Sequence, residues 1–329
     1  MAATGGGPRG KTPMSNKVTS RNFVQAETAH RFRAQLGRAP VNAFHHDRVP
    51  VHEAHPGAVR PNVDVLYSHA VVDVSEAATF ALEPSDEFQV DQVIDEQHYV
   101  VGVVYPGERL TLTRADLSSG THVYVLGRTS LAGGRDRAHR LQDLRRVEAL
   151  TANAYRPVDY DDASRRTVGT KLARRAGAAP DLSRAFGTPA TTDAEQHLLG
   201  TRLGWGGLPP EHGQYHEGVA TSSGCDIWTF DVPPVDPERG FYSVVKYDQR
   251  GRAGGDHTAI DGTEMMRNGD GTVSVYFGDD TCVATGNVIR TGPRERFRYA
   301  MRVYRPRDVD ETRQYLARLD ARGLETVLR

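Results

Sequence analysis

The sequence predicts a mainly β protein with helical connectors, an α+β chain built from two antiparallel domains of the β-sandwich or jelly-roll-like kind. Short runs rich in Val, Tyr, Leu and Thr recur between residues 59 and 127 and again between 217 and 304. Gly, Pro, Asn and Asp separate these runs, as in antiparallel sheets joined by tight turns. Helical periodicity is concentrated between the two β-rich stretches and at the ends of the chain.

Length and charge limit the class of protein. The chain has 329 residues, enough for two domains of ordinary size. Its 42 acidic residues nearly balance its 41 basic ones, so no basic excess points to nucleic acid. No apolar run approaches the length of a membrane span, and residues 1–16 lack the apolar core of a secretory signal. We therefore expect a cytoplasmic protein whose two cysteines, Cys225 and Cys282, are both reduced.

The first domain is expected over residues 18–150, after a tail at 1–17 that is rich in Gly, Pro and Lys and should be disordered. A helix at 20–36 has its apolar face around Phe32 and ends before Gly37. A loop rich in Pro and His follows it. A helical period, with Leu141, Leu144 and Val147 on one side, closes the domain over 136–150. Six strands are predicted between loop and helix, at 66–74, 79–82, 88–95, 98–105, 109–114 and 122–127.

A connector is expected over residues 151–191, with one helix at 163–176 between prolines. The second domain, residues 192–329, begins with a capping box at Thr192 and Glu195 that should start a helix running to Leu203. A charged helix at 308–319 closes it. Five strands are predicted in between, at 217–222, 226–230, 241–247, 273–277 and 298–304.

A polar segment leads into the first core strand. In an extended chain Asn62 and Asp64 point to one side and Tyr67 to the other. Such residues are typical of a site on a rigid scaffold. The competing interpretation is a turn, because Asn and Asp at the start of a strand often bond nearby backbone groups.

A second candidate lies at 95–99, where Glu96 and His98 would share one face of a strand or hairpin edge. A carboxylate beside an imidazole that titrates near neutrality can transfer protons. The competing interpretation is a hairpin turn with solvated charges. Arg128 ends an apolar run and could hold a carboxylate in a bidentate manner. Trp205, among glycines, is either a ligand platform or a core anchor.

The His-rich stretch at 45–55 suggests metal binding, since imidazoles and carboxylates are common metal ligands. Its spacing matches no compact ligand motif, so we expect no metal. The sequence also contains no P-loop, no dinucleotide fingerprint and no nucleophile elbow, so we expect no organic cofactor. If a metal does bind, the expected ligands are His46, Asp64, Glu96 and His98.

Two ordered sets of motifs resemble known bacterial families. The first set lies at 18–28, 44–48, 62–68, 93–99, 105–107, 110–114, 128–129 and 141–143, and the second at 204–207, 241–247, 270–278, 287 and 301–306. Together they resemble a tandem pair of families of unknown function, numbered 1254 in the N-terminal part and 1214 in the C-terminal part. The resemblance implies two β-rich domains joined by helices and a homo-oligomer, and no established reaction. The chain departs from the pattern at Val65, where the family usually has Thr, and at Tyr242, where it often has Trp.

These observations favour an enzyme that acts on a small polar organic substrate by side-chain acid–base chemistry, as a lyase, isomerase or hydrolase, in bacterial specialised metabolism. Its partner would be a small molecule, with neither nucleic acid nor membrane. One alternative is a non-catalytic ligand-binding or assembly protein with an aromatic groove near Trp205 and Tyr124. Another is a metal-dependent hydrolase or oxygenase. The expected catalytic residues are Asp64, His98 and Glu96, and the expected substrate-binding residues are Asn62, Tyr67, Arg128 and Trp205.

Overall fold

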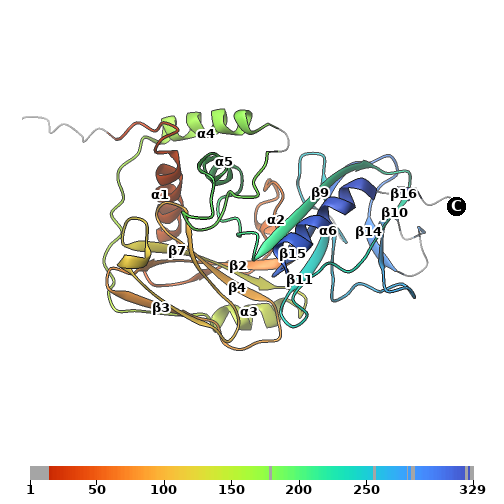
Figure 1. Ribbon diagram of the computed structural model, residues 1–329, viewed down its shortest axis with the longest axis horizontal. Coiled ribbons are helices and arrows are strands. Elements are labelled where there is room, and N and C mark those ends of the chain that lie inside the picture. The colour runs from red at the N-terminus through yellow and green to blue at the C-terminus, as the bar shows by residue number, and fades with distance from the viewer. Residues whose placement is uncertain are drawn as a thin grey trace, which may run out of the picture.

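The computed structural model describes residues 15–177, 180–254, 257–279, 281–282, 286–322 and 325–326. Most of the predicted tail lies outside these residues. Asn16, in the part of the tail that is described, forms an isolated β-bridge with Tyr160. The predicted mainly β fold with helical connectors is confirmed (Figure 1).

The N-terminal strands form a five-stranded sheet of order β1-β2-β7-β4-β5 and a three-stranded sheet of order β6-β3-β8. An apolar core that includes Phe80, Leu112 and Val125 lies between the two sheets. The strands are β1 His45–His46, β2 Val65–Asp73, β3 Ala77–Ala81, β4 Gln89–Ile94, β5 Val100–Val104, β6 Arg109–Thr113, β7 His122–Ser130 and β8 Arg146–Ala149.

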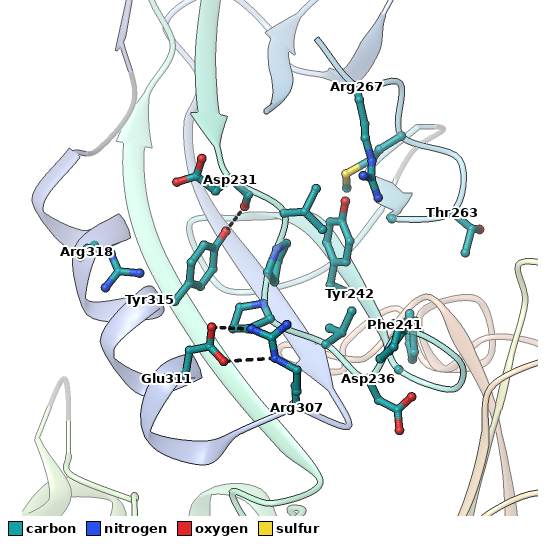
Figure 2. Close-up of a pocket in the computed structure, with 18 residues that line it drawn as sticks. Asp231, Asp236, Phe241, Tyr242, Thr263, Arg267, Arg307, Glu311, Tyr315 and Arg318 are labelled. Carbon is teal, nitrogen blue, oxygen red and sulfur yellow. Dashed lines mark hydrogen bonds and ion pairs between the residues drawn. The ribbon is translucent and has the colours of Figure 1, made fainter. Parts of the chain in front are cut away.

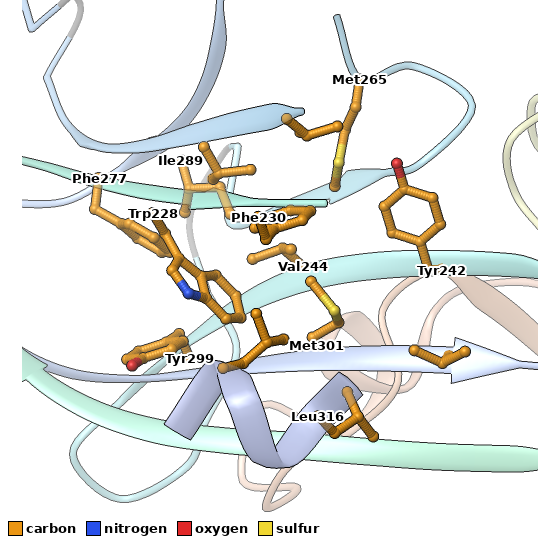
Figure 3. Packing of buried hydrophobic residues seen from close by; sticks show 14 of the residues in the cluster. Trp228, Phe230, Tyr242, Val244, Met265, Phe277, Ile289, Tyr299, Met301 and Leu316 are labelled. Carbon is orange, nitrogen blue, oxygen red and sulfur yellow. The ribbon is translucent and has the colours of Figure 1, made fainter. Parts of the chain in front are cut away.

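The C-terminal strands also form two packed sheets, of order β12-β11-β15-β9 and β14-β13-β10-β16. Trp228, Phe230 and Phe277 from the second sheet pack against Met301 and Tyr299 of the first (Figure 3). The strands are β9 Gly213–Thr221, β10 Cys225–Phe230, β11 Phe241–Asp248, β12 Ala259–Asp261, β13 Val273–Gly278, β14 Asn287–Arg290, β15 Arg296–Tyr304 and β16 Glu325–Thr326. β12, β14 and β16 were not expected from the sequence.

Three helices cover one side of the five-stranded sheet, and α6 packs beside β9 of the C-terminal half. α1, α4 and α5 pack on one another through residues such as Phe23, Leu172 and Leu199, and lie above β7 and β2 in Figure 1. α6 closes the C-terminal core through Tyr315 and Leu316. None of the helices in the described part of the chain is long and apolar enough to cross a membrane. The helices are α1 Phe23–Leu36, α2 Val51–Ala54, α3 Arg135–Asp143, α4 Asp162–Ala176, α5 Ala194–Gly204 and α6 Val309–Arg322.

The helix expected over 136–150 is wrong in its second half. α3 ends at Asp143, and the chain continues into β8, which pairs with β3. The apparent helical stripe included Leu144, which is 41% exposed, whereas Val147 packs against the N-terminal core. Between them Arg145 turns inward, and its fixed position ends the helix.

Arg145 and Asp91 form a fully buried ion pair, with Nε and Oδ1 2.8 Å apart. Arg145 also donates to the hydroxyl of Thr129 and to the carbonyl of Arg128. Arg145 therefore connects β4 and the turn before β8 to β7, the strand that carries Arg128. That strand is longer than predicted, because β7 continues through Arg128 to Ser130.

The expectation that both cysteines are reduced is wrong. Cys225 and Cys282 are joined by a disulfide that links β10 to the segment after β13. Disulfides persist mainly in oxidising compartments, so this bond weighs against the cytoplasmic location that the sequence suggested. The location itself stays a prediction.

We expect Arg145→Met to lower the free energy of unfolding by about 3–5 kcal/mol, because it leaves the Asp91 carboxylate buried without its counter-ion. The double variant Asp91→Leu with Arg145→Met should recover most of that loss, since an apolar pair needs no compensation. Urea denaturation of the three proteins measures both effects. A double variant whose loss equals or exceeds that of the single variant would show that the hydrogen bonds, rather than the charge, matter most.

Candidate functional site

The polar segment before β2 joins the two halves of the molecule. The Asn62 side chain accepts from the Asp64 N–H and donates to the hydroxyl of Tyr304 on β15. Asp64 accepts a 2.5 Å hydrogen bond from the Ser243 hydroxyl on β11. Asn62 and Asp64 therefore lie on the C-terminal sheet, and the chain enters the N-terminal sheet one residue later. The segment thus combines the local hydrogen bond expected of a turn, from the Asp64 N–H to Asn62, with hydrogen bonds to the C-terminal half.

Asp64 is buried in an environment that disfavours its charge. Burial raises the pKa of Asp64 to about 6, and the Ser243 hydrogen bond and the Arg302 charge only partly oppose this. Arg302 is itself buried, with its guanidinium over the Tyr247 ring, and its Nη1 has no hydrogen-bond partner among the described residues. The two charges are close enough to interact, but they do not form an ion pair within 4.0 Å in this part of the structure.

Tyr67 lies beside this junction, on the face of the sheet that the helices and the C-terminal half cover. It pairs with Arg128 across β2 and β7, and the guanidinium lies 5.7 Å from the centre of its ring. Arg128 also donates to Gln92 and to the carbonyl of Gly206. Arg128 thus holds Tyr67 and the segment after α5 in place, and its terminal nitrogens are already engaged with protein groups.

Next to Tyr67 is a hydrogen-bonded chain that the sequence did not indicate: Asp47, His69 and Tyr124. Asp47 Oδ2 lies 3.0 Å from His69 Nε2, and the Tyr124 hydroxyl lies 3.0 Å from His69 Nδ1. The Tyr67 ring stacks on His69 with their centres 6.1 Å apart. A carboxylate that orients an imidazole, which in turn contacts a hydroxyl, is the usual arrangement of an acid–base or nucleophilic site.

Strand register brings these three residues together. β1 pairs with β2 so that His45 lies opposite His69, and Asp47 follows directly. Tyr124 is on β7, where it pairs with Val71, the next residue after His69 on the same face of β2. The sequence analysis covered Asp47 only within the His-rich stretch and Tyr124 only as part of an aromatic groove, and it did not single out His69, because residues 47, 69 and 124 share no local pattern.

The surroundings of Asp47 and Tyr124 shift the pKa values of both side chains. Burial opposes the ionisation of Asp47, but the hydrogen bond from His69 and the charge of Arg38 outweigh it and lower the pKa of Asp47 to about 2. Burial raises the pKa of Tyr124 above its usual range, so the phenol keeps its proton. His69 is 14% exposed and Asp47 is 24% exposed, so solvent reaches this end of the chain.

The expected catalytic group of Asp64, His98 and Glu96 does not assemble. Val65 pairs with Ser130 and Ile94 pairs with Tyr124, six residues apart on β7, which is about 20 Å of strand. Asp64 and His98 therefore lie at opposite ends of the sheet.

His98 and Glu96 lie in a hairpin turn between β4 and β5, as the competing interpretation expected, but His98 is buried rather than solvated. His98 Nδ1 contacts the Thr201 hydroxyl, and its Nε2 accepts from the N–H of Gly206. Burial, with the nearby charge of His197, holds the pKa of His98 well below its ordinary value. Glu96 accepts from two backbone N–H groups of the 121–122 segment instead of contacting His98.

Trp205 is a core anchor rather than an open platform. Its ring stacks on His98 at 5.0 Å and meets Tyr124 edge-on at 4.9 Å. Its indole N–H donates to Thr28 on α1. The aromatic groove expected near Trp205 and Tyr124 is thus occupied by the rings of the protein itself.

The alternative metal ligands also lie apart. His46 contacts Ser68, and burial lowers its pKa to about 4, whereas Asp64, Glu96 and His98 have the partners described above. Across the residues that the structure describes, His, Cys, Asp and Glu side chains nowhere gather in a group of three or more that could hold a metal.

A second acid–base pair lies in an open cleft of about 590 Å³ between the two halves. The Tyr105 hydroxyl is 2.9 Å from His212 Nδ1, and the Arg305 guanidinium lies 4.2 Å from the centre of the Tyr105 ring. Burial lowers the pKa of His212. The sequence pointed to neither His212 nor Arg305 as a site residue.

Val65, where the sequence departs from the resembled pattern, packs in the same apolar cluster as the ring of Tyr105. It is fully buried in the apolar cluster between the two halves, with Phe88, Phe241 and Tyr304. The methyl group of valine therefore fills an apolar contact.

Comparison with known proteins agrees with the C-terminal part of the sequence resemblance. Residues 214–308 match the family described as "Protein of unknown function (DUF1214)". The fold is similar to that of the VPA0106 protein from Vibrio parahaemolyticus, with a TM-score of 0.69, 17% identity, and coverage of 94% of this chain and 98% of that one. An uncharacterized protein from Burkholderia cenocepacia is similar at a TM-score of 0.51 and 13% identity, over 87% of this chain and 84% of that one. No curated protein matches. At these identities the likeness concerns the fold alone.

The raised pKa of Asp64 predicts how stability depends on pH. The carboxyl is protonated more readily in the folded chain, at about 6, than at its ordinary value of 3.8. Its contribution to stability is therefore fully present below pH 3.8 and is lost as the pH rises through about 6. The difference corresponds to about 3 kcal/mol in the free energy of unfolding.

We expect Asp64→Asn to abolish this loss, so that the variant gains up to about 3 kcal/mol on wild type between about pH 4 and pH 7.5. Urea denaturation across that range measures it. Asp73→Asn is the matched control of opposite sign: hydrogen bonds from Ser75 and Asn153 outweigh burial and lower the pKa of Asp73 to about 2. That variant should be less stable than wild type at neutral pH. If the free energy of unfolding changed with pH in the same way in wild type and in Asp64→Asn, the raised pKa of Asp64 would be contradicted.

Proposed function

We propose that this protein is an enzyme that transfers protons on a small polar organic substrate by side-chain acid–base chemistry, without an organic cofactor. The observation that supports this most is the continuous chain from Asp47 through His69 to Tyr124. It lies on rigid strands, with Asp47 and His69 partly exposed to solvent and Tyr124 buried. Proton transfer is assigned to His69 and Tyr124 instead of Asp64 and His98, because strand register separates the latter two.

The chain suggests how the reaction would proceed. In the tautomer that this reaction requires, His69 donates through Nε2 to Asp47 and accepts at Nδ1 from the Tyr124 hydroxyl. In the reaction, Nδ1 takes a proton from the substrate, and the Asp47 carboxylate offsets the charge of the imidazolium. Tyr124, whose proton is held firmly, turns its hydroxyl to donate to the anion that develops on the substrate. The proton returns from His69 to substrate or product.

Positive charge around the site favours an anionic substrate. Arg38 forms an ion pair with Asp47, and the charges of Arg38 and Arg31 both act on the Tyr124 phenol. Arg38 and Arg31 are partly exposed, and each already pairs with a carboxylate of the protein, Asp47 and Glu27 respectively. We therefore propose small carboxylates with an acidic C–H or a carbonyl group as the substrate class. Isomerisation and elimination fit this chemistry, and so does hydrolysis.

The cleft that holds Tyr105 and His212 is a weaker candidate for the same chemistry. No carboxylate among the described residues bonds to its imidazole, and the lining holds four carboxylates, Glu108, Glu211, Asp236 and Glu238, against two arginines, Arg305 and Arg307. Such surroundings disfavour an anion. The Asp47–His69–Tyr124 chain has both the orienting carboxylate and the neighbouring cations.

Further expectations from the sequence stay proposals. We propose that the N-terminal part belongs to family 1254, on the motifs at 62–68 and 93–99, and that the protein is a homo-oligomer. We further propose a cytoplasmic location and a role in bacterial specialised metabolism. The Cys225–Cys282 disulfide favours testing the location first.

The experiment is proton exchange in deuterated water, followed by NMR, with a panel of small 2-oxo, 3-oxo and 2-hydroxy acids. Wild type should exchange the acidic C–H of at least one acid. His69→Gln and Tyr124→Phe should each slow that exchange by about 10²–10⁴-fold, which is the usual contribution of a positioned acid or base. Both substitutions keep the approximate size of the side chain, so the fold should persist.

His139→Gln is the matched control, because His139 is a partly exposed histidine on α3 whose imidazole hydrogen-bonds to the Arg48 carbonyl, away from the Asp47–His69–Tyr124 chain. It should exchange at the wild-type rate. Wild-type exchange in His69→Gln would overturn the assignment of the base. An absence of exchange with every acid would overturn the substrate class.

A further inference from the structure

A cleft of about 740 Å³ lies in the C-terminal half, away from the Asp47–His69–Tyr124 chain. Its walls are the segment after β10, the start of β11, the segment after β12, and α6 (Figure 2). The volume is within the range of sites that bind small organic molecules. We call it the α6 cleft.

One part of the α6 cleft is apolar. Val232, Val235 and Met265 line it, and these side chains also pack against the C-terminal core. Phe241 and Pro234 extend the same surface. An apolar body placed there would remove hydrocarbon surface from water on both sides, which is worth about 25 cal/mol per Å².

A hydroxyl is available beside this surface. Tyr242 is 5% exposed, yet its hydroxyl forms no hydrogen bond with any residue that the structure describes. Burial raises the pKa of Tyr242, and the charge of Arg267 opposes that rise. The guanidinium is therefore near the phenol, and Figure 2 shows it turned toward the hydroxyl.

Most charges around the α6 cleft are already paired, but two arginines are not. Arg307 is bound by Glu311 on α6, and Asp236 is bound by Arg305. Neither Arg267 nor Arg318 forms an ion pair within the described part of the chain. Asp231 contributes the remaining carboxylate of the lining. The unpaired charge of the cleft is thus net positive.

We infer that the α6 cleft binds an organic anion with an apolar body, whose carboxylate lies between Arg267 and the Tyr242 hydroxyl and whose body rests on Val232, Val235 and Met265. The guanidinium and the phenol both donate to the anion, and bonds of that kind are stronger than those between neutral groups. This binding requires no reaction. It is independent of the proposed proton transfer, which takes place in the other half of the molecule.

Isothermal titration calorimetry with 4-butylbenzoate tests the inference, with the neutral 4-butylbenzamide as the matched probe. The benzoate should bind in a saturable manner. The amide, which has the same body and no charge, should bind at least about tenfold more weakly. Equal affinities would overturn the inference, and so would the absence of saturable benzoate binding.

Variants locate the anion. Arg267→Gln should weaken the binding of the benzoate by about tenfold and leave that of the amide unchanged, because only the charged contact is lost. Tyr242→Phe keeps the buried ring and should weaken the benzoate about three- to tenfold. Arg313→Gln on α6 is the control, since Arg313 is paired with Asp310 and does not line the cleft. Unchanged benzoate affinity in Arg267→Gln would show that the anion binds elsewhere.

Discussion

Two hydrogen bonds before β2 fix how the halves of this protein meet. Asn62 binds Tyr304, and Asp64 binds Ser243, so the chain is held on the C-terminal sheet until the residue where the N-terminal sheet begins. Val65, which follows, is buried with Phe241 in the core between the halves. The polar bonds set the register and the apolar contacts supply the burial. Neither would specify the junction alone.

The register of β2 then determines which polar side chains meet. Because residues of one strand alternate between faces, Tyr67 and His69 lie on the same side, toward the helices and the C-terminal half. A shift of one residue would move both to the opposite face, into the apolar core between the N-terminal sheets. Gln142 secures the arrangement by donating to the carbonyls of Asp47 and Tyr67. The same pairing that builds the sheet therefore assembles the Asp47–His69–Tyr124 chain.

The sequence predicted well those features that repeat locally. Helices such as α1 and α4, and strands bounded by clear turns, appear within a few residues of their expected positions. It failed where long-range contacts decide: β16 has only two residues, and α3 ends because Arg145 reaches a carboxylate on another strand. The polar segment at Asn62 and Asp64 was recognisable because its residues are adjacent in the chain. The His69 chain was not, because three separate strands or their flanks supply it.

The buried carboxyl of Asp64 is hard to explain as a device for stability. An asparagine in its place could still accept from Ser243, and it would avoid the ionisation that the protein resists up to about pH 6. Arg302 faces the same site with a donor that no described residue satisfies, so neither charge fully compensates the other. Groups that are costly when ionised and titrate near neutrality are found preferentially where protons or ligands are exchanged. The junction that holds the two halves together lies beside the half-buried Tyr67 ring. Because Asp64 is part of it, the stability of this junction responds to pH near neutrality.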